Sequence, residues 1–279
     1  MEQVKFGFHI SIAGGLSRVC ARAENLQCET IQIFTRSPRA WKLTPLDEYE
    51  VNSFVQNIRD SGIAPVFVHA PYLPNLAGSD VVRSVDAIVA DAQRCYRLKV
   101  NYLIVHVGRA KGASQIQAIR RVAQNINRVL ERMPESVMLL LENTAGMGSE
   151  IGYRFEHIRD IMEQLEDSDR VGVVLDTAHL FEAGYDLRTK KGLDETLSCF
   201  DRTVGMSRLR LLHLNDSVTE LGSRIDRHWH IGKGRIGLRG FRGVVNHTLL
   251  RRLPGIMETP RKSYMDDISN MKTIRSLVK

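Results

Sequence analysis

The sequence predicts an α/β fold in which eight parallel strands, each followed by a helix, close into a (β/α)8 barrel. Apolar strand-like segments alternate with amphipathic helical segments along the whole 279-residue chain. The strand segments lack polar alternation, which is typical of strands buried on both faces. Polar residues stand at the carboxyl end of nearly every strand, where a barrel builds its active site.

A doubly wound open sheet is the alternative, because it uses the same alternation of strands and helices. It does not explain why polar residues follow nearly every strand. We therefore expect a single barrel domain over residues 1–279, a length that one such domain reaches.

The strands are expected where short apolar segments lie between turn signals. The sixth is the clearest, because Val171–Leu175 is uninterrupted and runs directly into Asp176. In chain order the predicted strands are Lys5–Ser11, Thr30–Thr35, Pro65–His69, Tyr102–His106, Val137–Glu142, Val171–Asp176, Leu209–Leu214 and Gly255–Thr259.

The helices are expected from apolar residues that recur at helical spacing. The first begins near Leu16, a weaker one precedes the eighth strand, and a capping box from Ser263 to Asp266 announces the last. The second, third and fourth carry Val51, Phe54, Val55 and Ile58, then Val81, Val85, Ile88 and Ala92, then Ile116, Ile119, Ala123, Ile126 and Leu130.

Composition favours a cytoplasmic protein with no membrane partner. Hydrophobic residues make up 43% and charged residues 25%, as in globular proteins. No apolar segment approaches the roughly 18 residues of a membrane span, and the N-terminus lacks the layout of a secretory signal. The four cysteines are scattered without a C-x-x-C pair, which argues against a disulfide framework or a thiolate zinc site. The net charge of +7 favours polyanionic partners, nucleic acid above all.

Nine imidazole and carboxylate side chains stand at or just beyond the predicted strand ends. They are His69, His106, Glu142, Asp176, His179, His213, Asp226, His228 and Glu258. From His69 to His213 the strand-end members are 34 to 37 residues apart, about one strand–helix unit, so a barrel would gather them around one axis.

Taken singly, each of these residues has an ordinary alternative, as a hydrogen-bonded core histidine or a carboxylate that caps a helix. Buried together, the nine would need cations to offset desolvation and mutual repulsion. Nine ligands exceed what one zinc uses, so we predict two or three ions with a bridging carboxylate. Such ions suit in-line phosphoryl displacement, and with the basic charge they indicate phosphodiester hydrolysis in a nucleic acid.

Four motifs carry a specific resemblance. Leu141–Gly146, Leu175–His179, His213–Asp216 and Gly222–His228 resemble signatures of endonuclease IV, the zinc-dependent abasic-site endonucleases (AP endonuclease family 2). The resemblance covers nearly the whole chain. It implies a TIM barrel with three Zn²⁺ ions that acts in base excision repair. The enzyme would incise double-stranded DNA on the 5′ side of an abasic site and leave a 3′-hydroxyl, with a metal-bridging hydroxide as the nucleophile.

The resemblance also implies roles for individual residues. His69, His106 and Glu142 would hold the first zinc, with Glu142 bridging to the second; Asp176, His213 and Glu258 would complete the second; and His179, Asp226 and His228 would hold the third. Glu142, Asp176 and Glu258 are the implied catalytic residues, and Arg39, Tyr72 and Leu73 the implied DNA-binding residues. Side chains that fill the base stack suit a lesion without a base to unstack. We expect a monomer.

Four positions depart from the family pattern: Ala178, Val218, Trp229 and Arg109. None is a matched ligand, so they concern loop contacts with DNA rather than the metal site. His9, at the end of the first strand, could support the metal site or be a core histidine. Residues 232–237 fit G-x-G-x-x-G but follow no strand, so we interpret them as a flexible loop rather than a dinucleotide site.

Two other functions fit part of the pattern. A sugar isomerase or epimerase of the xylose isomerase-like type would use Glu142, Asp176, His213 and Glu258 around one divalent ion. It leaves the other five side chains without a purpose. A DNA-binding barrel that has lost catalysis is the third interpretation, and the presence of every matched ligand argues against it.

Overall fold

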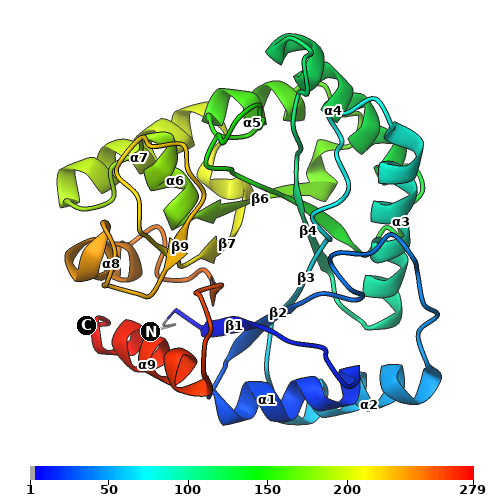
Figure 1. Cartoon of the computed structure of the whole chain (residues 1–279), viewed down its shortest axis with the longest axis horizontal. Helices are drawn as coiled ribbons and strands as arrows, with labels where there is room; N and C mark the ends of the chain where they lie inside the picture. The colour runs from blue at the N-terminus through cyan, green and yellow to red at the C-terminus, as the bar shows by residue number, and fades with distance from the viewer. Residues whose placement is uncertain (1–3) are drawn as a thin grey trace.

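Eight parallel strands close into a barrel in the computed structural model, which describes residues 4–279 (Figure 1). Each strand pairs with the next along the chain, and β10 closes the barrel by pairing with β1. The barrel strands are β1 Phe6–Ile10, β2 Thr30–Ile33, β3 Val66–His69, β4 Tyr102–His106, β5 Met138–Glu142, β6 Val171–Asp176, β7 Leu209–His213 and β10 Gly255–Met257. The predicted barrel is therefore confirmed, with each strand end within two residues of its expected position.

The helices surround the barrel on the outside (Figure 1). They are α1 Val19–Asn25, α2 Glu48–Ser61, α3 Val81–Arg97, α4 Gln115–Leu130, α5 Phe155–Met162, α6 Thr177–Ala183, α7 Lys190–Thr203, α8 Gly237–Asn246 and α9 Tyr264–Ser276. Residues 4–279 thus hold nine helices, where eight were expected, because the connection from β6 to β7 contains two. Gly184 separates them: its φ of 107° ends α6 in the left-handed conformation. None of these helices is long and apolar enough to cross a membrane.

A layer of apolar side chains from six strands fills the inside of the barrel. Its members are Phe67, Ile104, Leu140, Val174, Leu211 and Ile256. Alternate residues of a strand point to the same face, so the residue two positions later also points to the barrel axis. That residue is, in the same order, His69, His106, Glu142, Asp176, His213 and Glu258. The ring of polar residues therefore lies one layer above the apolar interior, at the carboxyl rim.

The segment after β7 differs most from its expected form. It contains a short antiparallel pair, β8 Asp216–Ser217 and β9 His228–Trp229, within a region expected to be irregular. The glycine-rich residues 232–237 wrap around Asp216, whose carboxylate accepts hydrogen bonds from the backbone N–H groups of Gly234, Ile236 and Gly237. A Cβ at Gly234 would lie 2.6 Å from Asp216 Oδ1, so the close approach requires glycine. These N–H groups already bind a carboxylate of the chain, which agrees with rejecting a dinucleotide site.

Candidate metal centre

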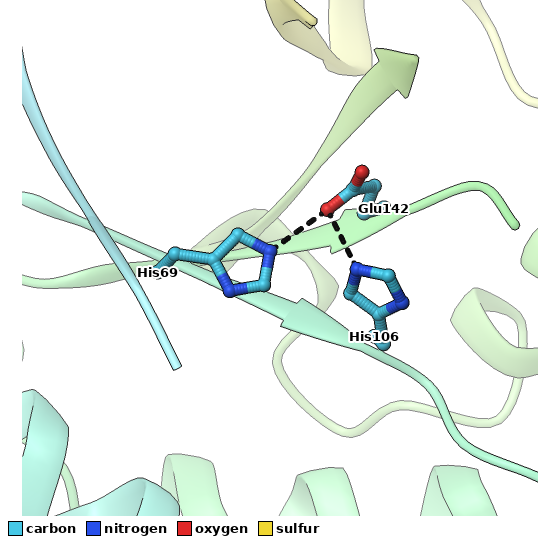
Figure 2. A group of neighbouring side chains, drawn as sticks. All are labelled: His69, His106 and Glu142. Atoms are coloured by element: carbon cyan, nitrogen blue, oxygen red, sulfur yellow. Dashed lines mark hydrogen bonds and ion pairs between the residues drawn. The ribbon is translucent and has the colours of Figure 1, made fainter. Parts of the chain in front are cut away.

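Glu142, at the end of β5, lies at the centre of the predicted cluster and is fully buried. Its Oε2 lies 3.0 Å from His69 Nε2 and 3.2 Å from His106 Nε2 (Figure 2). Its Oε1 lies 3.0 Å from His213 Nδ1 and 3.4 Å from His179 Nδ1. Each carboxylate oxygen therefore faces two imidazoles, an arrangement that suits a carboxylate shared between two ions.

A second group forms on the opposite side of Glu142. It consists of Glu142, Asp176, His213 and Glu258, and one potential ligand atom from each lies within 4.8 Å of all the others. His213 Nδ1 is 3.3 Å from Glu258 Oε2 and 3.7 Å from Asp176 Oδ2. One nitrogen and three carboxylates, gathered on one point, form a donor set for a divalent ion.

The third group joins α6 to the loop after β7. His179 Nε2 and His228 Nε2 are 3.3 Å apart, and Asp226 Oδ1 lies 3.5 Å from the first and 3.7 Å from the second. Asp176 Oδ2 also lies 3.6 Å from His228 Nε2, so Asp176 is within reach of the second and third groups alike. The sequence assigned Asp176 to the second group alone. All nine predicted side chains are thus brought together at one rim.

The hydrogen bonds of the imidazoles support metal binding, because they fix which ring nitrogen carries the proton. His69 Nδ1 lies 2.6 Å from the carbonyl of Ala70, and His179 Nδ1 lies 2.9 Å from that of Asn143. A carbonyl oxygen only accepts hydrogen bonds, so each Nδ1 carries a proton, and when the ring is neutral its Nε2 offers a lone pair to the cluster. The donor set therefore fits zinc, which is bound by neutral imidazole and carboxylate.

Opposite charges shift the pKa values of the cluster. Burial raises the pKa of Glu142, but His213 and His106 hold it well below its usual range. Burial lowers the pKa of His213, but Glu258 and Glu142 raise it to about 9. Burial also lowers the pKa of His179, but Asp176, Asp226 and Glu142 raise it well above its usual range. Without cations, these carboxylates are balanced by protonated imidazoles.

Two asparagines of the quoted motifs orient the carboxylates, although sequence reasoning assigned them no individual role. Asn143 Oδ1 accepts a hydrogen bond of 2.7 Å from the backbone N–H of Asp176. Asn215 Nδ2 donates to Asp176 Oδ2 at 2.7 Å, and its Oδ1 accepts from the N–H of Glu258 at 2.7 Å. Asn143 directly follows the strand-end ligand Glu142, and Asn215 stands two positions after His213. This position just beyond a strand-end ligand is the sequence signal that could have indicated them.

Glu182 is a buried carboxylate that the sequence analysis missed. Its Oε1 accepts hydrogen bonds from Ser217 Oγ at 2.7 Å and from the backbone N–H of Arg227 at 3.0 Å. Burial raises the pKa of Glu182 to about 7. The contact ties α6, which carries His179, to the loop that carries Asp226 and His228. One turn of helix separates Glu182 from His179, and that spacing is its only sequence signal.

Two of the three expected DNA-binding residues, Tyr72 and Leu73, lie at the mouth of the centre. Tyr72 is 65% exposed, and its ring centroid lies 6.1 Å from that of His69 and 6.3 Å from that of His106. Leu73 is half-buried beside it, and both line a cavity of about 400 Å³ that reaches His106. Arg39 is exposed on the loop after β2, which a buried ion pair of Arg36 with Asp91 anchors.

The four departures from the family pattern lie in different surroundings. Arg109 lines the same cavity as Tyr72 and pairs with Glu150 at 2.7 Å. Val218 is 44% exposed and Trp229 is 36% exposed, both on the β8–β9 hairpin region, whereas Ala178 is fully buried in α6. Three of the four positions are therefore accessible to a macromolecule, and one is part of the core.

Known proteins share this sequence and fold over almost their full length. A sequence model of the xylose isomerase-like TIM barrel matches residues 20–276. A protein of Methanoculleus marisnigri (strain ATCC 35101 / DSM 1498 / JR1) named probable endonuclease 4 is 44% identical over 278 residues, 98% of this chain and 99% of the relative. The crystal structure of endonuclease IV from Thermus thermophilus is 34% identical with a TM-score of 0.88, over 98% of both chains.

More distant structures share the fold alone. A D-tagatose 3-epimerase-like protein superposes with a TM-score of 0.75 at 16% identity, over 98% of this chain and 97% of that protein. At this identity the likeness concerns the barrel and carries no conclusion about activity.

Proposed function

The chain belongs to the endonuclease IV family, and on that premise we propose that it is a zinc-dependent DNA repair endonuclease that hydrolyses the phosphodiester 5′ to abasic sites. The proposal extends to the three Zn²⁺ ions, the 3′-hydroxyl product and double-stranded DNA as the substrate. The single observation that carries it is the convergence of nine imidazole and carboxylate side chains on one rim, in three groups that share Glu142 and Asp176.

We assign one ion to each of the three groups. His69, His106 and Glu142 would hold the first, Glu142, Asp176, His213 and Glu258 the second, and Asp176, His179, Asp226 and His228 the third. When bound, the ions would ionise water at neutral pH and neutralise charge on the scissile phosphate. The chain itself holds its donors in place, through the carbonyls behind His69 and His179 and the amides of Asn143 and Asn215.

Recognition of the lesion would depend on the residues around the mouth. Tyr72 stands over His69 and His106, so an aromatic ring inserted into the duplex would leave the flipped nucleotide near the cluster. Leu73 beside it and Arg39 on the loop after β2 would complete the contact. Arg109 and Lys111 line the adjacent cavity and bring positive charge to a phosphate backbone.

Incision of a defined duplex tests this function. Zinc-loaded protein should cut a duplex with one tetrahydrofuran abasic analogue on its 5′ side, leave a 3′-hydroxyl that a polymerase extends, and spare the matched intact duplex. Elemental analysis should find about three zinc ions per chain. Glu142→Gln should lower the rate by at least about 100-fold, since it removes the shared carboxylate. Metal-replete protein that leaves the abasic duplex uncut would contradict the proposal.

A sugar isomerase or epimerase remains the second candidate, favoured by one observation. Glu142, Asp176, His213 and Glu258 form a complete four-ligand group by themselves. That function needs one ion per chain and turnover of a ketose, whereas the endonuclease needs the other two groups as well. A DNA-binding barrel without catalysis would bind the abasic duplex, leave it intact and be indifferent to Glu142→Gln.

We further propose that residues 1–279 form one catalytic domain that works as a monomer in the cytoplasm. The barrel accounts for residues 4–279, and the first three lie outside the described residues. Sedimentation of the zinc-loaded protein should give one species near 31.6 kDa at micromolar concentration. With an abasic duplex, the mass should rise by that of one duplex per chain.

A further inference from the structure

One histidine of the centre is oriented by a side chain rather than by the backbone. His69 and His179 point their Nδ1 at carbonyl oxygens, and His228 Nδ1 lies 3.3 Å from the carbonyl of Glu258. His213 instead places its Nε2 2.8 Å from Oε1 of Gln32. A substitution cannot remove a backbone carbonyl, but it can remove Gln32.

Gln32 lies on β2 and is fully buried. It is a polar residue between two apolar ones, Ile31 and Ile33, and every residue of this strand is buried. Its Oε1 faces His213, and its Nε2 donates to Glu258 Oε1 at 2.5 Å. One amide therefore contacts both His213 and Glu258, two of the four members of the second group. Gln32 itself has neither a carboxylate nor an imidazole to offer to a metal ion.

Hydrogen-bond chemistry fixes the orientation of this amide. An ionised carboxylate only accepts, so Glu258 must face the NH₂ end of Gln32. The carbonyl end then faces His213, and because it only accepts, His213 Nε2 must carry a proton. When the ring gives up its other proton to bind a metal ion, it presents the lone pair of Nδ1 on the side of Glu142, Glu258 and Asp176.

His9 completes the arrangement on β1. His9 Nδ1 lies 2.9 Å from Gln32 Nε2 and 3.3 Å from Glu258 Oε1, so His9 contacts both the amide and the carboxylate that the amide holds. The other ring nitrogen of His9, Nε2, is a buried atom without a hydrogen-bond partner among the described residues. His9 and Gln32 thus supply the β1 and β2 positions of the polar rim that the other six strands fill with potential ligands. This arrangement favours the supporting role of His9 over that of an isolated core histidine.

We propose that Gln32 is a positioning residue of the metal centre: it selects the metal-binding tautomer of His213 and holds the carboxylate of Glu258 against the same ion. The proposal rests on the proposed metal-dependent function. It distinguishes Gln32 from the nine potential ligands, since its effect is confined to the ion held by His213 and Glu258. Groups that orient ligands in this way are typically worth about 10- to 100-fold in metal affinity.

Gln32→Met is the first test, because methionine matches the length of glutamine without its hydrogen bonds. Zinc binding is measured by competition with a chromophoric chelator on the full chain. We expect one ion of the bound set to be held about 10- to 100-fold more weakly and the others to be unchanged. The weakened ion should be the one lost in His213→Ala and retained in His69→Ala, identified by its absorption bands after cobalt substitution.

Thr30→Val is the matched control. Thr30 is on the same strand, is also fully buried, and donates from Oγ1 to the carbonyl of Pro65 at 2.6 Å, away from the ligands. Its loss should leave all zinc affinities within about twofold of wild type, well below the effect expected of a ligand-orienting group. Gln32→Asn, whose amide is one methylene too short to bridge both partners, should weaken the same ion and serves if the methionine variant does not fold.

The outcomes separate the two proposals. A folded Gln32 variant whose zinc affinities all match wild type overturns the role of Gln32 and leaves the endonuclease untouched. Equal weakening of every ion, or equal weakening in Thr30→Val, also overturns it, since the effect would then be a general loss of packing. A wild-type protein that binds no zinc and cuts no abasic duplex instead contradicts the proposed function.

Discussion

Zinc loading of the metal-free protein should release protons, because imidazoles of the cluster are protonated when no metal is bound. Burial lowers the pKa of His213, but Glu258 and Glu142 raise it to about 9, so at pH 8 this ring is about 90% protonated. An imidazole binds zinc only when neutral. Loading should therefore release about 0.9 proton per chain from His213 alone. The pKa of His179 also lies well above its usual range, and its proton adds to the total.

The sign of the pH dependence follows from the raised pKa. The proton is bound below about pH 9, so the His213 contribution is nearly complete at pH 8 and falls as the pH rises through about 9. In the metal-free protein the same shift stabilises the fold: that contribution is fully present below pH 6.5 and is lost as the pH rises through about 9.

Calorimetric titration of zinc into chelator-treated protein measures the release. The apparent enthalpy, determined in buffers of different ionisation enthalpy at one pH, varies linearly with that enthalpy, and the slope is the number of protons. His247→Gln is the control, because it removes an imidazole that pairs with Asp194 outside the centre and should leave the slope unchanged. A slope below about half a proton at pH 8 would refute the reasoning, as would a release that increases between pH 8 and 9.5.

Three further predictions concern other parts of the molecule. Burial raises the pKa of Glu182 to about 7, so its contribution to stability is retained below pH 4.5 and lost as the pH rises through 7. Glu182→Gln does not titrate, so its free energy of unfolding should increase by about 3 kcal/mol relative to wild type over that interval, measured by urea unfolding of the metal-free protein. Asp91→Ala leaves the buried Arg36 unpaired and should cost about 3–5 kcal/mol in denaturant unfolding, whereas exchanging both partners for apolar residues should cost far less. Tyr72→Ala should weaken binding of an abasic duplex by about 1–3 kcal/mol in fluorescence titrations, and Tyr96→Ala, which removes an exposed tyrosine of α3, should have no effect.

The sequence was sufficient for the barrel and for the identity of its rim, because both depend on short-range patterns. Continuous apolar segments such as Val171–Leu175 are the local signature of strands buried on both faces. The strand-end residues are spaced almost evenly because each strand–helix unit contributes one of them. Each of the six strand-end residues stands two positions after a residue of the apolar interior, as Glu142 follows Leu140, so the alternation of a strand already directs it inward.

Local sequence patterns did not predict the extra helix between β6 and β7 or the β8–β9 pair after β7. Gly184 divides the connection after β6, but a glycine in a helical pattern is equally compatible with a loop or an uninterrupted helix. Each strand of the β8–β9 pair is two residues long, which is too short to show a hydrophobic period. The loop between the two strands is held by a hydrogen bond from the backbone N–H of Arg227 to Glu182.

Which atoms face one another was decided only by closure of the barrel. In the sequence Gln32 is a polar residue in an apolar strand, and its partner Glu258 lies 226 residues away. Asp176 was expected to belong to one group of ligands only, yet its carboxylate lies within reach of two groups. Hydrophobic periodicity is a local property of the chain, whereas tautomers and shared carboxylates depend on buried side chains from different strands meeting at one end of the barrel. Such contacts exist only once the first and last strands have paired.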